Sequence, residues 1–75
     1  MVYDIVVDVL CDQLEIDEND IDMESSIGDD LGADSISFID IIMELEDEFD
    51  IDIPDEVAED MRTVADLVEY IEAHI

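Results

Sequence analysis

The chain has 75 residues, 49% of them hydrophobic, and it carries 26 Asp and Glu against a single Lys or Arg, which gives a formal net charge of −25. A chain of this length forms one domain that buries about 60% of its unfolded surface, so it has no room for a second domain or a deep enzyme pocket. The charge excludes nucleic-acid binding as the primary activity, because phosphates would be repelled, and it indicates partners with basic surfaces.

The first predicted element is an amphipathic helix from Val2 to Leu14. Its apolar residues recur at helical spacing with aspartates between them, and they are Val2, Ile5, Val6, Val9, Leu10 and Leu14. Between Glu15 and Asp34 this periodicity fails, and the composition predicts a long loop. Isolated apolar residues should pin the loop to the core, namely Ile16, Ile21, Ile27 and Leu31. A loop of this length is usually functional or disordered, which draws attention to its end.

A second helix is predicted from Ser35 to Phe49, with Asp34 as its N-cap and with Pro54 breaking the helix that precedes it. Only a short helical piece fits between Asp55 and Met61. An approximate capping box of Thr63 and Asp66 begins the last helix, whose apolar stripe is Val64, Leu67, Val68, Ile71 and Ile75. We therefore predict an all-α fold: one domain over residues 1–75, built as a small four-helix bundle of three longer helices and one short third helix, with a long loop between helices 1 and 2.

The second helix has two apolar faces. Its core stripe is Phe38, Ile41, Ile42, Leu45 and Phe49. The opposite side, which we call the outer face, combines apolar with acidic residues: Ile36, Ile39, Asp40, Met43, Glu44, Glu46 and Asp47. One interpretation is a docking surface, in which the apolar groups supply contact area and the carboxylates orient a basic partner. The alternative is that the apolar groups touch the long loop or the third helix and the acids form a solvated face.

Two function classes fit the sequence poorly. An enzyme needs a nucleophile with a base, and the only histidine, His74, lies near the end of the chain, so we predict no catalytic residue. A calcium sensor is suggested by the acidic loop, but the EF-hand pattern fails, because the sixth position from Asp17 is Asp22 where glycine is required. We therefore predict no specific metal site.

The sequence Asp29-Asp30-Leu31-Gly32-Ala33-Asp34-Ser35-Ile36 places a serine at the head of the second helix. A serine there is most often a cap, but Asp34 can cap instead and leave the hydroxyl outward. This motif resembles the acyl carrier proteins, of the free-standing type of dissociated fatty-acid synthesis. The resemblance extends over nearly the whole chain, through Glu44-Leu45-Glu46-Asp47-Glu48-Phe49, Ile53-Pro54-Asp55-Glu56 and Val68-Glu69-Tyr70-Ile71.

The resemblance implies that Ser35, beside Asp34, carries 4'-phosphopantetheine, which a phosphopantetheinyl transferase supplies from coenzyme A. The thiol of this group would hold growing acyl chains as thioesters for delivery to the basic surfaces of acyl-transfer and fatty-acid synthesis enzymes. The outer face of the second helix would be the main recognition element for these partners. Inner residues of the helices would line the space for the acyl chain, among them Phe38, Ile41, Ile53 and Met61.

Departures from the common pattern leave the partner synthase and the acyl chain length open. Ser37 stands where an acidic residue is usual, Phe38 where a smaller residue is usual, and the first helix lacks almost all basic residues. The alternatives are a carrier for polyketide, peptidyl or D-alanyl transfer, and an acidic module that binds partners without covalent attachment. The last of these would keep its full function after replacement of Ser35 by alanine.

The absence of three sequence features predicts the cellular compartment of the protein. No apolar run approaches the roughly 20 residues needed to span a bilayer, and the N-terminus has neither the basic segment nor the cleavage site of a secretory signal. Cys11 is the only cysteine and has no partner for an internal disulfide, in agreement with a reducing compartment. We expect a monomer in the cytoplasm.

Overall fold

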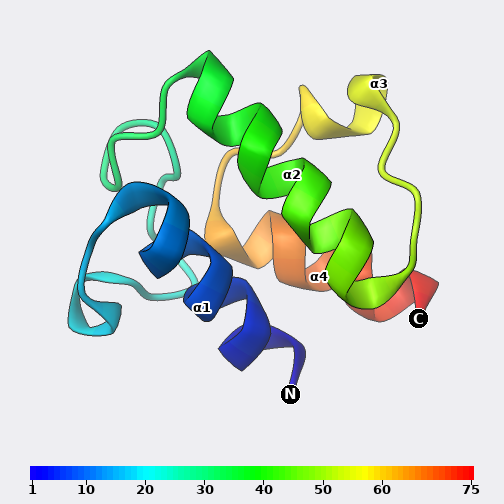
Figure 1. The fold of residues 1–75 in the computed structure, drawn as a ribbon, viewed down its shortest axis with the longest axis horizontal. Coiled ribbons are helices and arrows are strands. Elements are labelled where there is room, and N and C mark those ends of the chain that lie inside the picture. Colours follow the sequence, from blue (N-terminus) through cyan, green and yellow to red (C-terminus); the bar gives the residue numbers. More distant parts are fainter.

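The structure, a computed structural model that describes residues 1–75, has four α-helices and no strand. The helices are α1 (Val2–Leu14), α2 (Ser35–Phe49), α3 (Asp55–Ala58) and α4 (Val64–His74), and a single 3-10 turn, η1 (Glu18–Asp20), lies in the loop after α1. Helix α1 packs against both α2 and α4, and the short α3 lies in the connection between those two helices (Figure 1). This arrangement confirms the predicted all-α bundle.

The starts of α2 and α4 are fixed by side chains that accept backbone hydrogen bonds. The carboxylate of Asp34 accepts the N–H of Ser37 at 2.8 Å, as expected for an N-cap. At α4 the predicted capping box is present, since the hydroxyl of Thr63 accepts the N–H of Asp66 at 3.3 Å and the carboxylate of Asp66 accepts the N–H of Thr63 at 3.1 Å. Helices α1 and α2 span the predicted ranges.

The end of α2 has a different cause from the one the sequence suggested. The helix stops at Phe49, because Asp50 adopts a left-handed conformation with φ of 52° and donates its N–H to the carbonyl of Glu46. Aspartate tolerates this conformation better than most residues do. Pro54 lies four residues further on and is the N-cap of α3, where its fixed φ of −62° suits the start of a helix.

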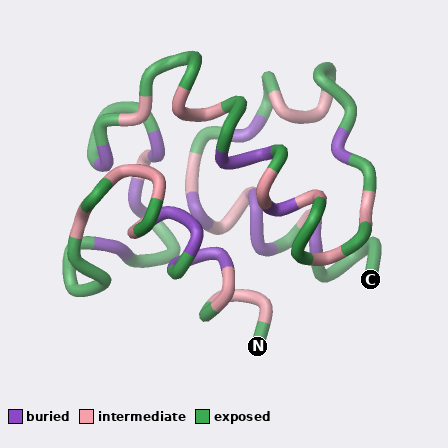
Figure 2. The backbone as a smooth tube through the Cα atoms, in the orientation of Figure 1, coloured by how far each residue is buried: buried purple, intermediate pink, exposed green.

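The core contains 16 buried apolar residues from the three longer helices, the long loop and the connections on either side of α3. Figure 2 marks the buried positions along the backbone, and they recur on all three longer helices. Three residues depart from the predicted stripes. Ile5 was placed in the stripe of the first helix, but it is half-buried and does not pack against the core. Val7 is only 6% exposed although it lies beside the stripe of α1, since α1 is covered by both α2 and α4. Ile75 was placed in the stripe of the last helix, but it follows the end of α4 and is 68% exposed.

The long loop is pinned to the core as predicted, since Ile21, Ile27 and Leu31 are buried and Ile16 packs against them. It is also tied to the segment that leads into α4. The N–H of Ile27 donates to the carbonyl of Arg62 at 2.9 Å, the N–H of Val64 to the carbonyl of Ser25 at 3.1 Å, and the N–H of Ala65 to the carbonyl of Met23 at 2.9 Å. The loop therefore holds a defined path to the start of α2. None of the helices has the length and apolar character needed to cross a membrane.

The connection between α2 and α3 is held by a side chain that the sequence placed on the outer face. The carboxylate of Glu46 accepts the backbone N–H of Ile53 at 2.8 Å, and Ile53 is 4% exposed. Further along the connection, the hydroxyl of Tyr70 donates to the carbonyl of Asp52 at 3.2 Å. Glu46 thus has a structural role that periodicity alone did not indicate.

Replacing Glu46 by Ala is expected to lower the free energy of unfolding by about 1 kcal/mol, because the N–H of the buried Ile53 loses its acceptor. Glu46→Gln keeps an acceptor oxygen and is expected to retain most of the stability. Urea denaturation followed by circular dichroism measures both. Glu48→Ala is the matched control, since it removes the same charge from an exposed residue of the same helix. Equal stabilities of the Glu46→Ala and Glu48→Ala variants would contradict the structural role of Glu46.

Candidate functional site

Ser35 is the first residue of α2, and its side chain is exposed. The preceding residue, Asp34, caps the helix, so the cap does not occupy the Ser35 hydroxyl. The backbone N–H of Ser37 and then its side chain hold the pKa of Asp34 below the usual value for an aspartate. Asp34 therefore remains ionised at neutral pH beside an accessible hydroxyl.

The turn before α2 explains how the hydroxyl is presented. Leu31 is 7% exposed and anchors the turn in the core, while Gly32 has a positive φ of 78° that an L residue with a side chain rarely adopts. The carboxylate of Asp30 accepts the N–H of Ser26 at 2.8 Å, and the N–H of Ala33 donates to the carbonyl of Ile27 at 3.1 Å. The burial of Leu31 confirms that it pins the loop to the core, and the left-handed conformation of Gly32 lets the chain turn tightly before α2.

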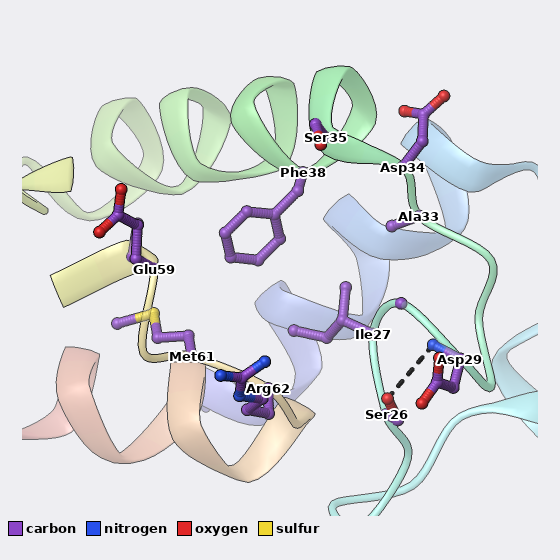
Figure 3. A pocket seen from close by; sticks show the side chains of 12 residues that line it. Ser26, Ile27, Asp29, Ala33, Asp34, Ser35, Phe38, Glu59, Met61 and Arg62 are labelled. Atoms are coloured by element: carbon purple, nitrogen blue, oxygen red, sulfur yellow. Dashed lines mark hydrogen bonds between the residues drawn. The ribbon is translucent and has the colours of Figure 1, made fainter. Parts of the chain in front are cut away.

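A pocket of about 310 Å³ lies next to Ser35. The end of the long loop, the start of α2 and the segment from α3 to α4 form its walls, as Figure 3 shows. The lining is half apolar and half polar, and it consists of Ser26, Ile27, Gly28, Asp29, Ala33, Asp34, Ser35, Phe38, Ala58, Glu59, Met61 and Arg62. This volume is at the lower end of the range of ligand pockets in proteins.

The four residues proposed from the sequence as an acyl lining fall in different places. Phe38 and Met61 line the pocket beside Ser35. Ile53 lines a second pocket of about 220 Å³ between α2, α3 and the connection that joins them, and Phe38 lines both pockets. Ile41 is fully buried and lines neither of them. Phe38 and Ala58 therefore lie between the space at Ser35 and the space between α2 and α3.

The outer face of α2 keeps its apolar residues in solvent. Ile36 is 73% exposed, Ile39 57% and Met43 58%, so these side chains lie mostly in solvent, and Ile39 and Met43 also border the second pocket beside α3. This observation favours the docking interpretation over the alternative. An exposed row of large apolar side chains on one helix is typical of an interaction surface.

The four acids of the outer face differ in what they contact. Asp40 and Asp47 are exposed and accept no hydrogen bond from the chain. Glu44 accepts the Nε2–H of Gln13 on α1 at 3.1 Å, and Glu46 holds the connection to α3. The exposed pair is therefore the part of this face that is free to meet a basic partner.

Two groups considered from the sequence lie away from the pocket. His74 is in the last turn of α4, where its ring stacks on Tyr70 with centroids 4.0 Å apart and its Nδ1 lies 2.7 Å from the carbonyl of Tyr70. No histidine lines the pocket at Ser35. Burial raises the pKa of the Cys11 thiol, and four nearby carboxylates, led by Glu18, raise it further, so the thiol is protonated at neutral pH.

Arg62 is a pocket residue that the motif did not indicate. It lies about 30 residues from the motif in sequence and reaches the pocket because the long loop is tied to the start of α4. One signal was available in the sequence, since Arg62 is the only Lys or Arg of the chain.

Comparisons with known proteins agree with this geometry. The family described as "Phosphopantetheine attachment site" matches residues 4–71. An acyl carrier protein from Clostridium acetobutylicum is 55% identical over 74 residues, which is 99% of this chain and 96% of the relative. Another from Clostridium perfringens is 47% identical over 72 residues, covering 96% and 95% of the two chains. Among solved structures, a putative acyl carrier protein from Mycobacterium tuberculosis superposes with a TM-score of 0.92, at 32% identity and 97% coverage of both chains.

Proposed function

The chain belongs to the acyl carrier protein family, whose members bear 4'-phosphopantetheine covalently, and we propose that Ser35 is the residue that bears it here. As a member of this family the chain is a carrier and not an enzyme, and it interacts with a phosphopantetheinyl transferase and with synthesis enzymes. When bound, the group supplies a thiol that holds acyl groups as thioesters.

The observation that carries the proposal is the exposed Ser35 hydroxyl at the N-terminus of α2, next to a pocket and beside a separate capping residue. A phosphodiester at this position lies at the positive end of the helix dipole, which favours an anion. In the transfer, the hydroxyl oxygen of Ser35 bonds to the phosphorus that bears pantetheine, the pyrophosphate bond of coenzyme A breaks, and adenosine bisphosphate leaves. The hydroxyl proton passes to a base of the transferase, since no histidine lines the pocket.

Other features of the function are part of the same proposal. Residues 1–75 act as one carrier domain around a single core, and the outer face of α2 docks to basic partners through Ile36, Ile39 and Met43 with Asp40 and Asp47. The acyl chain lies in the spaces lined by Phe38, Met61 and Ile53. The carrier works as a monomer in the cytoplasm, where the protonated Cys11 thiol stays unpaired.

We assign the carrier to fatty-acid synthesis. The support is the residue pattern that resembles carriers of this pathway over nearly the whole chain, together with the names of its bacterial relatives. Carriers for polyketide, peptidyl or D-alanyl transfer are the alternatives within the family. Peptidyl and D-alanyl carriers differ in the acyl group that is loaded and in the enzyme that loads it.

The test loads the chain with coenzyme A, magnesium and a broad-specificity phosphopantetheinyl transferase, and then offers the product to a malonyl transferase with malonyl-coenzyme A. Intact mass and peptide fragmentation are expected to show one phosphopantetheine on Ser35 and then one malonyl group on its thiol. A holo-protein that refuses malonyl but accepts D-alanine or another amino acid from its activating enzyme would reassign the pathway. A folded chain that takes up no phosphopantetheine would leave an acidic interaction module as the better account.

A further inference from the structure

We propose that Arg62 binds the pantetheine arm of the group on Ser35, with its guanidinium donating hydrogen bonds to the amide carbonyl oxygens of the arm. The inference rests on the proposed attachment at Ser35. It makes Arg62 a positioning residue that holds the arm across the pocket beside α2.

The first observation is that the only Lys or Arg side chain of a chain with 26 carboxylates is not used in an ion pair. The one ion pair of the structure joins the N-terminal amine to Asp4, at 4.0 Å. The carboxylate of Asp66, four residues along, instead accepts the backbone N–H groups of Arg62 at 2.8 Å and of Thr63 at 3.1 Å. These bonds are the main cause of the lowered pKa of Asp66, and the nearby charge of Arg62 lowers it further. The guanidinium itself forms no ion pair or hydrogen bond and is exposed, so it is available to a ligand.

The second observation is that the backbone of Arg62 is fixed on two sides. Its N–H donates to Asp66 in α4, and its carbonyl accepts the N–H of Ile27 in the long loop at 2.9 Å. These bonds fix the point at which the exposed Arg62 side chain leaves the backbone, at the rim of the pocket. Figure 3 shows Arg62 near Met61 and Ile27, on the side of the pocket that faces Ser35 and Phe38.

The third observation is the chemistry of the walls. The arm alternates apolar segments, including a pair of geminal methyl groups, with two amides. Phe38, Met61 and Ile27 offer apolar contact for the former. The carboxylates of the lining, Asp29, Asp34 and Glu59, accept hydrogen bonds when ionised and cannot donate to a carbonyl. Amide N–H groups therefore have acceptors on these walls, whereas the amide carbonyls need a donor.

Arg62 is the charged donor in the lining, and its guanidinium has five N–H groups in a planar fork. An arm that starts at Ser35 and crosses the pocket reaches the wall that carries Arg62. A hydrogen bond from a charged donor to an amide carbonyl is also stronger than one between neutral groups. Arg62 thus supplies the charged hydrogen-bond donor that the amide carbonyls of the arm need and that the carboxylates of the lining cannot provide.

The test compares holo-protein of the native sequence with Arg62→Gln and with the double variant Arg62→Gln/Asp60→Asn. Asp60 is exposed and does not line the pocket, and its neutralisation restores the native net charge. Each protein is loaded with isotope-labelled pantetheine from coenzyme A. Nuclear Overhauser contacts between the geminal methyls and Phe38 or Met61 are measured, together with the carbonyl shifts of the arm, the ³¹P shift and the melting temperature.

We expect both variants to melt like the native protein, to lose these contacts by about twofold to tenfold, and to move the carbonyl shifts toward those of free phosphopantetheine, as for the loss of one exposed hydrogen bond. Unchanged contacts in both variants would overturn the inference. So would recovery of the contacts in the double variant, which would assign the effect to net charge, or a change confined to ³¹P, which would place the guanidinium at the phosphodiester. Failure of the proposed function is a separate result, because the native chain would then show no added mass at Ser35.

Discussion

Replacing Ser35 by Ala is expected to abolish loading by a phosphopantetheinyl transferase completely, because the variant lacks the oxygen that forms the bond to phosphorus. The effect is all-or-none, in contrast to the partial losses that follow from weakened docking. The fold should be unaffected, since Ser35 is exposed and Asp34 rather than Ser35 caps α2. Intact mass after incubation with coenzyme A and magnesium gives the loaded fraction directly.

Ser37→Ala is the matched control, because it removes a hydroxyl from the first turn of the same helix. The backbone N–H of Ser37, which the cap at Asp34 uses, remains in this variant. We expect its loading to be complete. Loading of Ser35→Ala at any other residue, or loss of loading in both variants while circular dichroism shows native helix, would contradict the assignment of Ser35.

The helices were predictable from the sequence because their signals are local. In α1 and α2 the apolar stripes and the absence of internal Gly and Pro define the helical ranges, and Asp34 and the pair of Thr63 and Asp66 mark the starts of α2 and α4 within three residues of sequence. The place of Ile36, Ile39 and Met43 opposite the core stripe also followed from periodicity, but their exposure did not, because the sequence left open whether the long loop or the third helix covers them.

The features that the sequence did not predict depend on contacts between distant segments. The bond from Ile53 to Glu46 spans a left-handed turn at Asp50, and periodicity does not fix which residue adopts that conformation. Arg62 lines the pocket at Ser35 only because backbone hydrogen bonds join the long loop to the start of α4. The burial of Val7 similarly reflects two helices covering α1 from different sides. Such pairings are set by tertiary packing, which single-sequence periodicity does not contain.

Truncating Leu45 and Met43 to Ala should separate the two faces of α2, because the two residues are neighbours on one helix with opposite exposure. Leu45 is fully buried and Met43 is 58% exposed. Leu45→Ala is expected to cost about 2 to 5 kcal/mol of stability, since it leaves a cavity in the core. This is a large part of the total for a domain of this size, at roughly 0.05 to 0.15 kcal/mol per residue. Met43→Ala is expected to change stability by less than about 0.5 kcal/mol. Urea denaturation measures both.

Partner binding should show the reverse order for the variants that remain folded. Met43→Ala is expected to lower kcat/KM for the phosphopantetheinyl transferase about fivefold to thirtyfold, the usual cost of truncating an apolar residue at the centre of an interface. Met23→Ala is the matched control, because Met23 is 38% exposed in the long loop, outside the outer face of α2, and its backbone bond to Ala65 is kept. Equal kinetics for the two methionine variants would remove the outer face of α2 as the docking surface. A loss confined to Met43→Ala means that the exposed apolar row on α2 serves recognition, because Met43 contributes nothing to the core that Leu45 stabilises.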